Sequence, residues 1–140
     1  MMDIQKANKA AFRAYLEAPI GDAAAIERYI HPDIILPPDI EGGVAGLKRL
    51  YDVYATQFEM SSAVTDLVAE DDLVMARVLT RGRHIGEYMG LPGTGRPFEV
   101  EEMLIARFVD GKQIEVWRVA DRLSLFQQLG GRTEDLTHPA

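Results

Sequence analysis

Asp121 is the residue whose place in the sequence most suggests acid–base chemistry. It follows an alternating run in which Trp117, Val119 and Asp121 share one face of an expected β-strand. The helical spacing of residues 123–129 begins directly after it, so Asp121 can be either the N-cap of that helix or a carboxylate that faces a pocket. Burial in a pocket raises the pKa of a carboxyl group and keeps its proton exchangeable near neutral pH, as general acid–base catalysis requires.

His84 is the second candidate. It lies in a long strand expected over residues 73–88, on a face made mostly of small residues, which leave room for a ligand or for close backbone approach. These small residues are Val74, Ala76, Val78, Thr80, Gly82 and Gly86. A lone histidine is more often structural than catalytic, so both interpretations stand.

The third candidate lies on the strand expected over residues 98–109, and its identity depends on the hairpin turn at residues 110–111. If this is a plain two-residue turn, Glu102 shares the face of Trp117 and is a buried acid. If a glycine bulge follows a type I turn, the parity flips and Met103 and Arg107 take that face instead. The sequence leaves both registers open.

These candidates must be positioned by the secondary structure of the chain. Along the sequence, the expected helices come first and the long strands follow. Apolar stripes predict helices over residues 3–17, 23–30 and 44–58, and they place Tyr15, Tyr54 and Phe58 on the packed sides. Alternation predicts strands over residues 34–36, 62–68, 73–88, 98–109 and 112–120, before the short last helix. This order predicts an α+β domain over residues 1–130, with a curved antiparallel sheet that forms a cone around a ligand cavity. Residues 131–140, with His138, read as a polar tail.

The composition excludes several classes of function. The chain has 140 residues, 47% hydrophobic and 26% charged, and its net charge of -7 argues against binding to nucleic acid or to anionic membranes. It contains no cysteine, which excludes disulfides and thiolate metal sites and agrees with the cytoplasmic location that we expect. The histidines have no metal-ligand spacing, and residues 90–96 (GLPGTGR) lack the ending of a phosphate loop. We therefore expect a small-molecule site that needs no metal or cofactor.

Residues 84–130 resemble the SnoaL-like polyketide cyclases, also called ester cyclases. The shared features are a His-x-Gly pair, a Gly-Leu-Pro-x-Thr-Gly-like loop, an Arg-Phe-x-Asp-Gly-Lys strand end, a Trp followed four residues later by an Asp, and a Gln-Leu-Gly ending. Residues 42–54 are also similar to the start of the family's third helix.

The resemblance implies the nuclear transport factor 2-like fold, a cone of helices and curved sheet with an internal cavity. It also implies an intramolecular aldol condensation, in which the Asp after the Trp removes a proton α to a carbonyl group and helps return one to the forming alkoxide. Asp121 stands at that position, and His84 is the closest match to an assisting polar group. The corresponding polar position on the preceding strand holds Arg107, which cannot act as a base.

The expected ligand is a small apolar or aromatic molecule that carries a carbonyl group. We expect its pocket to be lined by Trp117, Arg107, Glu102, Met103, Tyr15, Tyr54 and Phe58. The other face of the last strand carries Ile114, Val116 and Ala120, and as the outer sheet face it is expected to form a homodimer or homotetramer.

Three alternatives stay open within the same fold. A ketosteroid-isomerase-like enzyme would use Tyr15 and Asp39, although residues 104–105 lack the second acid of its oxyanion hole. An epoxide-hydrolase-like enzyme would combine Asp121 with Arg107 or Arg83. A third alternative is a domain that binds apolar ligands or oligomerises without catalysis.

Overall fold

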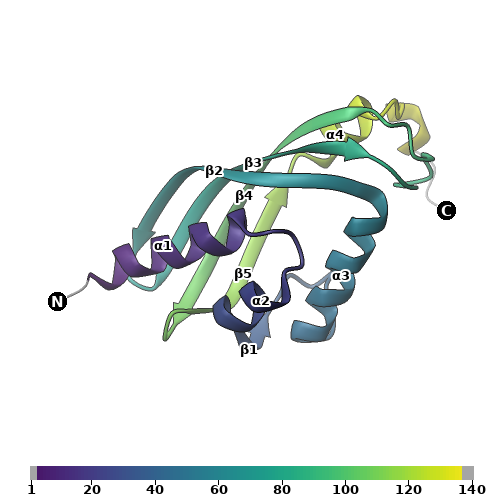
Figure 1. Ribbon diagram of the computed structural model, residues 1–140. Helices are drawn as coiled ribbons and strands as arrows, with labels where there is room; N and C mark the ends of the chain where they lie inside the picture. The colour runs from purple at the N-terminus through teal and green to yellow at the C-terminus, as the bar shows by residue number, and fades with distance from the viewer. Residues whose placement is uncertain (1–2, 137–140) are drawn as a thin grey trace.

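The computed structural model describes residues 3–136, which form helices packed on one curved sheet (Figure 1). The helices are α1 (Ile4–Glu17), α2 (Ala23–Tyr29), α3 (Gly43–Gln57) and α4 (Arg122–Gln128), with a 3-10 turn at Thr133–Leu136. The strands are β1 (Ile30–Ile35), β2 (Phe58–Glu70), β3 (Leu73–His84), β4 (Pro97–Val109) and β5 (Lys112–Ala120). The sheet order is β1-β5-β4-β3-β2, antiparallel except for the parallel pair β1 and β5. The predicted α+β fold is confirmed.

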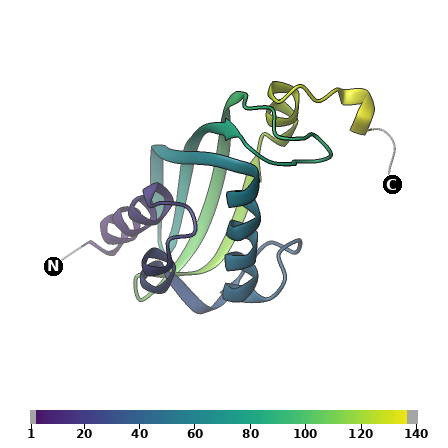
Figure 2. The ribbon, with the colours of Figure 1, turned by 45° about the vertical axis from the view of Figure 1, so that its right-hand side comes forward.

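Helices α1, α2 and α3 lie on the same side of the sheet, and α4 lies beyond its far end (Figure 2). The largest core cluster forms between α1 and the strands behind it. Phe12 of α1 is fully buried and meets Phe108 of β4 edge to face, with ring centroids 5.8 Å apart. Burying such a side chain contributes roughly 1.5 to 3 kcal/mol, so this contact fixes α1 across the sheet. None of the helices within residues 3–136 is long and apolar enough to cross a membrane.

Aspartates begin three of the helices, as N-capping chemistry predicts. The Asp3 carboxylate accepts the Gln5 N–H, and the Asp22 carboxylate accepts the Ala25 N–H at 3.0 Å. The prediction that Asp22 caps α2 is confirmed.

Several predicted boundaries move. β1 begins at Ile30, which was predicted to be the last residue of the second helix, because Ile30 pairs with Gln113 of β5. β2 begins at Phe58, earlier than predicted, and pairs there with His84. β3 ends at His84, four residues early, because the chain turns back there: the His84 N–H donates to the Arg96 carbonyl.

The β4–β5 hairpin combines features of both predicted registers. Asp110 and Gly111 both have positive φ, 50° and 79°, which is the signature of a two-residue type I′ turn. A bulge then follows, since Phe108 pairs with Gln113 while Arg107 pairs with Glu115. The extra residue in β5 flips the parity of everything beyond it.

The faces of β5 are therefore the reverse of those predicted. Val116 packs against the core beneath the helices, opposite Ala106 of β4, which is fully buried. Trp117 and Val119 have the opposite parity and are 43% and 75% exposed, and Val119 also borders the large cavity. The expectation that Val116 and Ala120 form the outer face is thus wrong, because both line the internal cavities described below. The predicted C-terminal tail includes the turn at Thr133–Leu136, and His138 lies outside the described residues.

Candidate active site

Two adjoining cavities lie between the helices and the concave face of the sheet. The larger one, called here the large cavity, has a volume of about 590 Å³ and extends from α3 across β2–β5 to α4. The smaller one, the small cavity, has about 130 Å³ and lies among α1, α2, α3 and the inner ends of β1 and β5. Tyr54, Glu102 and Arg118 line both of them. A space of several hundred Å³ suits a small organic ligand.

One wall of the large cavity is aromatic. The Phe58 ring meets Tyr88 and Phe98, each with a ring-centroid distance of 5.1 Å, and Leu125 of α4 closes the same cluster. Phe58 lies here because β2 starts directly at the end of α3. Such a wall offers flat apolar surface to a planar ligand.

A charged cluster stands where the two cavities meet. Arg118 of β5 holds Glu102 of β4 with two parallel hydrogen bonds, Nε to Oε2 at 3.1 Å and Nη2 to Oε1 at 3.3 Å. Its Nη1 also donates to the Tyr54 hydroxyl of α3 at 3.1 Å. The side chains of Arg118 and Glu102 are only 24% and 16% exposed, so water screens this pair weakly. Such forked pairing is the strongest form of ion pair between side chains.

Arg118 stays charged in this position. Burial alone lowers the pKa of a guanidinium, but the charge of Glu102 and the Tyr54 hydroxyl outweigh it and raise the pKa of Arg118 above its ordinary value. A guanidinium also carries more N–H donors than these contacts use. Arg118 can therefore still donate to a ligand oxygen in either cavity.

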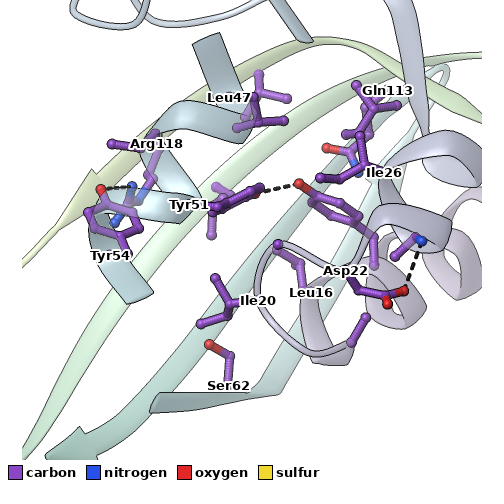
Figure 3. Close-up of a pocket in the computed structure, with 18 of the residues that line it drawn as sticks. Leu16, Ile20, Asp22, Ile26, Leu47, Tyr51, Tyr54, Ser62, Gln113 and Arg118 are labelled. Carbon is purple, nitrogen blue, oxygen red and sulfur yellow. Dashed lines mark hydrogen bonds between the residues drawn. The ribbon is translucent and has the colours of Figure 1, made fainter. Parts of the chain in front are cut away.

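The small cavity also holds a pair of tyrosines. Tyr15 of α1 and Tyr51 of α3 share a hydrogen bond between their hydroxyls. Burial raises the pKa of both hydroxyls, and their mutual contact raises that of Tyr15 further. Both therefore stay neutral at physiological pH. Figure 3 shows Tyr51, with its hydrogen bond dashed, between Arg118 and Tyr54 on one side and Gln113 on the other.

Asp121 caps α4 and stands in the sequence between two residues that line the large cavity. Its Oδ1 accepts the Ser124 N–H at 3.1 Å, and its own N–H donates to the Glu101 carbonyl at 3.1 Å. The side chain is exposed and lines neither cavity, whereas its neighbours Ala120 and Arg122 both line the large one. The structure thus adopts the cap alternative for Asp121 and keeps it beside the cavity.

His84 is fully buried behind the aromatic wall and lines neither cavity. Its Nδ1 accepts the Thr94 N–H at 3.3 Å and lies 3.0 Å from the Thr94 hydroxyl, which leaves the proton of the neutral ring on Nε2. Within residues 3–136, Nε2 has no hydrogen-bond partner. The loop that follows His84 passes close to the end of α3 at Gly86, where a Cβ would lie 2.0 Å from the Thr56 carbonyl oxygen. His84 therefore holds the loop of residues 85–96 against β3.

Three other predicted pocket residues lie on the opposite face of the sheet. Met103 and Trp117 are 53% and 43% exposed, and Arg107 pairs with Asp72 at 2.8 Å and with Glu115 at 3.5 Å. The prediction that they line the cavity is wrong. The bulge in β5 changes which residues of that strand face the helices, and the alternate residues of β4 and β5 are the buried ones, so these three side chains point outward.

The remaining predicted residues have mixed positions. Glu102, Tyr54 and Phe58 line the large cavity, and Tyr15 lines the small one. Asp39 also lines the large cavity, so it does not share a cavity with Tyr15. Arg83 and Arg107 lie outside both, so within residues 3–136 neither arginine joins Asp121 in a cavity as the epoxide-hydrolase alternative requires.

Arg118, Tyr51 and Gln113 are the site residues that sequence reasoning missed. Arg118 has a signal that could have found it: a charged residue between Val116 and Ala120 on an otherwise apolar face. Gln113 has none, because it lies next to the hairpin turn and is buried only through the bulge and the pairing with β1.

Comparison with known proteins identifies the family. The sequence model of the SnoaL-like polyketide cyclases matches residues 9–129. The chain belongs to the SnoaL-like polyketide cyclase family. The relatives of this family member include aklanonic acid methyl ester cyclase AcmA of Streptomyces galilaeus, 29% identical over 136 residues that cover 92% of this chain and 94% of AcmA.

Two further relatives agree with this membership. Nogalonic acid methyl ester cyclase of Streptomyces nogalater is 30% identical over 93 residues, 62% of this chain and 69% of that protein. The solved structure of TsrD from Streptomyces laurentii superposes with a TM-score of 0.79 at 31% identity, covering 94% of this chain and 100% of TsrD.

Proposed function

We propose that this family member is an ester cyclase that closes a ring in an aromatic polyketide methyl ester by intramolecular aldol addition. The observation that carries the proposal is the match to AcmA along nearly the whole of both chains. The geometry supports it, since the large cavity has an aromatic wall for a planar substrate and a charged donor at its inner end.

Ring closure needs a base, donors for the enolate oxygen and a proton for the new alkoxide. In the proposed mechanism the substrate carbonyl lies against Arg118 and the Tyr54 hydroxyl, both of which can donate to the developing negative charge. A preorganised donor of this kind contributes about 2.7 to 4 kcal/mol to lowering the barrier. Glu102 then acts by fixing the direction in which Arg118 donates.

The proton transfers are assigned to Asp121. It stands between two residues of the cavity wall, and its capping bond uses Oδ1 and leaves Oδ2 available. In this mechanism Asp121 removes the α proton, the enolate carbon attacks the second carbonyl group, and the same carboxyl returns the proton to the new alkoxide. No atom is gained or lost, so product and substrate are isomers.

His84 is proposed as a positioning residue. It touches the back of Phe58, with ring centroids 5.8 Å apart, and holds the loop that carries Tyr88 into the cavity wall. Its effect on catalysis would therefore pass through the shape of that wall.

A second copy of this chain is proposed as the partner of the outer sheet face. Cross-strand pairing sets Val68, Met75, Ile105 and Trp117 in one row over four strands. In this outer row Val68, Met75 and Trp117 are exposed and Ile105 is half-buried, and ion pairs such as Arg77 with Asp66 and Arg107 with Asp72 flank the row. Apolar surface with charges of both signs around it can meet its own copy across a two-fold axis.

The direct test of the cyclase proposal is product formation from an aromatic polyketide methyl ester. We expect the purified protein to convert it into an isomer of unchanged mass with one carbonyl fewer, seen by chromatography, mass and carbon NMR. Ring closure at the rate of a protein-free control would contradict the proposal.

A further inference from the structure

Gln113 lines the small cavity at the end away from Arg118 and carries an amide hydrogen-bond donor. Its side chain is 1% exposed and lines that cavity, and its Nε2 finds no hydrogen-bond partner within residues 3–136. A buried amide N–H without a partner loses the hydrogen bonds that water gave it, so such groups are rare unless they have a function. Gln113 is not part of the mechanism described above.

The walls around Gln113 are apolar. Ile26, Ile30, Ile34 and Leu47 form one buried cluster there, each less than a tenth exposed. Figure 3 shows Gln113 beside Ile26 at one end of the cavity and Arg118 with Tyr54 at the other. The small cavity therefore has apolar walls between the proposed catalytic donors, Arg118 and Tyr54, and the unpaired amide N–H of Gln113.

The charged residues around the small cavity disfavour an anion beside Gln113. The charged residues that line the small cavity are Asp22, Glu102 and Arg118. Arg118 is paired with Glu102, and Asp22 is an exposed carboxylate that caps α2, so neither supplies a free cation to the cavity. A carboxylate at Gln113 would lie buried without a cation, which is costly, whereas a neutral carbonyl would only need the amide N–H.

We propose that the small cavity is a subsite for a short neutral arm that ends in a hydrogen-bond acceptor, and that Gln113 Nε2 donates to the carbonyl of that arm. The inference rests on the proposed function: in a polyketide methyl ester the ester arm fills the small cavity while the rings stay in the large one. Gln113 then determines specificity, because it selects the methyl ester over the free acid.

The test uses three ligands that differ only in the arm: methyl anthraquinone-2-carboxylate, anthraquinone-2-carboxylic acid and 2-propylanthraquinone. Their dissociation constants are measured by titration with the whole protein, the variant Gln113→Met and the matched variant Gln127→Met. Methionine has the length of glutamine but no donor, and Gln127 is exposed on α4 outside both cavities.

The unaltered protein should bind the ester about ten-fold more tightly than the propyl compound, since one buried hydrogen bond separates them. It should bind the acid more weakly than the ester by at least a similar factor. Gln113→Met should bind the ester and the propyl compound equally well, whereas Gln127→Met should keep the ratio. Because methionine removes an unpaired donor, Gln113→Met should melt no lower than the unaltered protein.

An unchanged ester-to-propyl ratio in Gln113→Met would overturn the inference, and so would failure of the ester to bind the unaltered protein. Ring closure is measured separately and decides the proposed function. A protein that cyclises its substrate while Gln113→Met keeps the ratio is a cyclase without this subsite. A protein that shows the ratio change but no ring closure has the subsite without the proposed activity.

Discussion

Arg118 and Arg107 lie in the same hairpin but face opposite sides of the sheet. Arg118 is mostly buried and joins Glu102 to Tyr54 at the junction of two cavities. Arg107 is half-exposed on the outer face and pairs with Asp72 and Glu115. The pKa of each is raised by its partners, yet only Arg118 lines the cavities. The bulge in β5 sets the parity of the strand, and this parity decides which of the two arginines lines the cavities.

The difference between the two arginines is tested by making the same substitution on both faces of the sheet. Arg118→Met leaves Glu102 without its partner near a cavity, so it should lower the free energy of unfolding by about 2 to 4 kcal/mol. The lost donor should also reduce kcat by roughly 10²-fold or more. Arg107→Met should leave both quantities almost unchanged, because solvent screens exposed ion pairs.

Urea unfolding and steady-state kinetics of the two variants measure these effects. Equal losses in both variants would show that the hairpin arginines serve only the stability of the sheet. A loss confined to Arg107→Met would place the chemistry on the outer face.

A charge in the middle of the outer row tests what that face does instead. Trp117→Glu should turn a dimer into a monomer at tens of micromolar, because it buries an unpaired carboxylate in the proposed contact. Ser61→Glu is the matched control, since Ser61 is exposed on β2 opposite Arg81 and away from the outer row. Sedimentation velocity distinguishes them, and a monomeric unaltered protein would refute the proposed dimer.

A smaller effect is expected from the buried tyrosines of the inner side. Burial raises the pKa of Tyr15 and Tyr51 above their ordinary value of 10.0, so the folded state keeps protons that the unfolded chain loses. Their contribution to stability is fully present below pH 10 and is lost as the pH rises above it.

We therefore expect the free energy of unfolding to fall more steeply above pH 10 in the unaltered protein than in a Tyr15→Phe, Tyr51→Phe double variant. Unfolding by urea at a series of pH values measures the slopes. Identical slopes would mean that the two hydroxyls titrate normally in the folded state.

The sequence was sufficient to predict the elements but not which face of each strand is buried. The bounds of β5 and the cap of α2 are local properties, and their predictions agree with the structure. The side of the sheet that Trp117 faces depends on one extra residue in β5, which no local pattern marks. The aromatic wall and the Glu102–Arg118 pair were hidden for the same reason, because they form only once the register is known.

For Asp121 the local pattern was clear but fitted two roles. Its two predicted roles, cap and cavity acid, need the same position at the junction of β5 and α4, so the pattern could not separate them. Thr94 limits the prediction for His84 in a similar way, since a loop ten residues later supplies the contact that buries it.

The most direct test of the proposed role of Asp121 compares the unaltered protein with Asp121→Asn in ring closure of a polyketide methyl ester. Asparagine caps a helix as well as aspartate does, so the melting temperature should stay close to that of the unaltered protein. We expect kcat/KM to fall by about 10²- to 10⁴-fold, because the proton transfers lose their carboxylate. An Asp121→Asn variant that closes the ring at the full rate would contradict the proposed role.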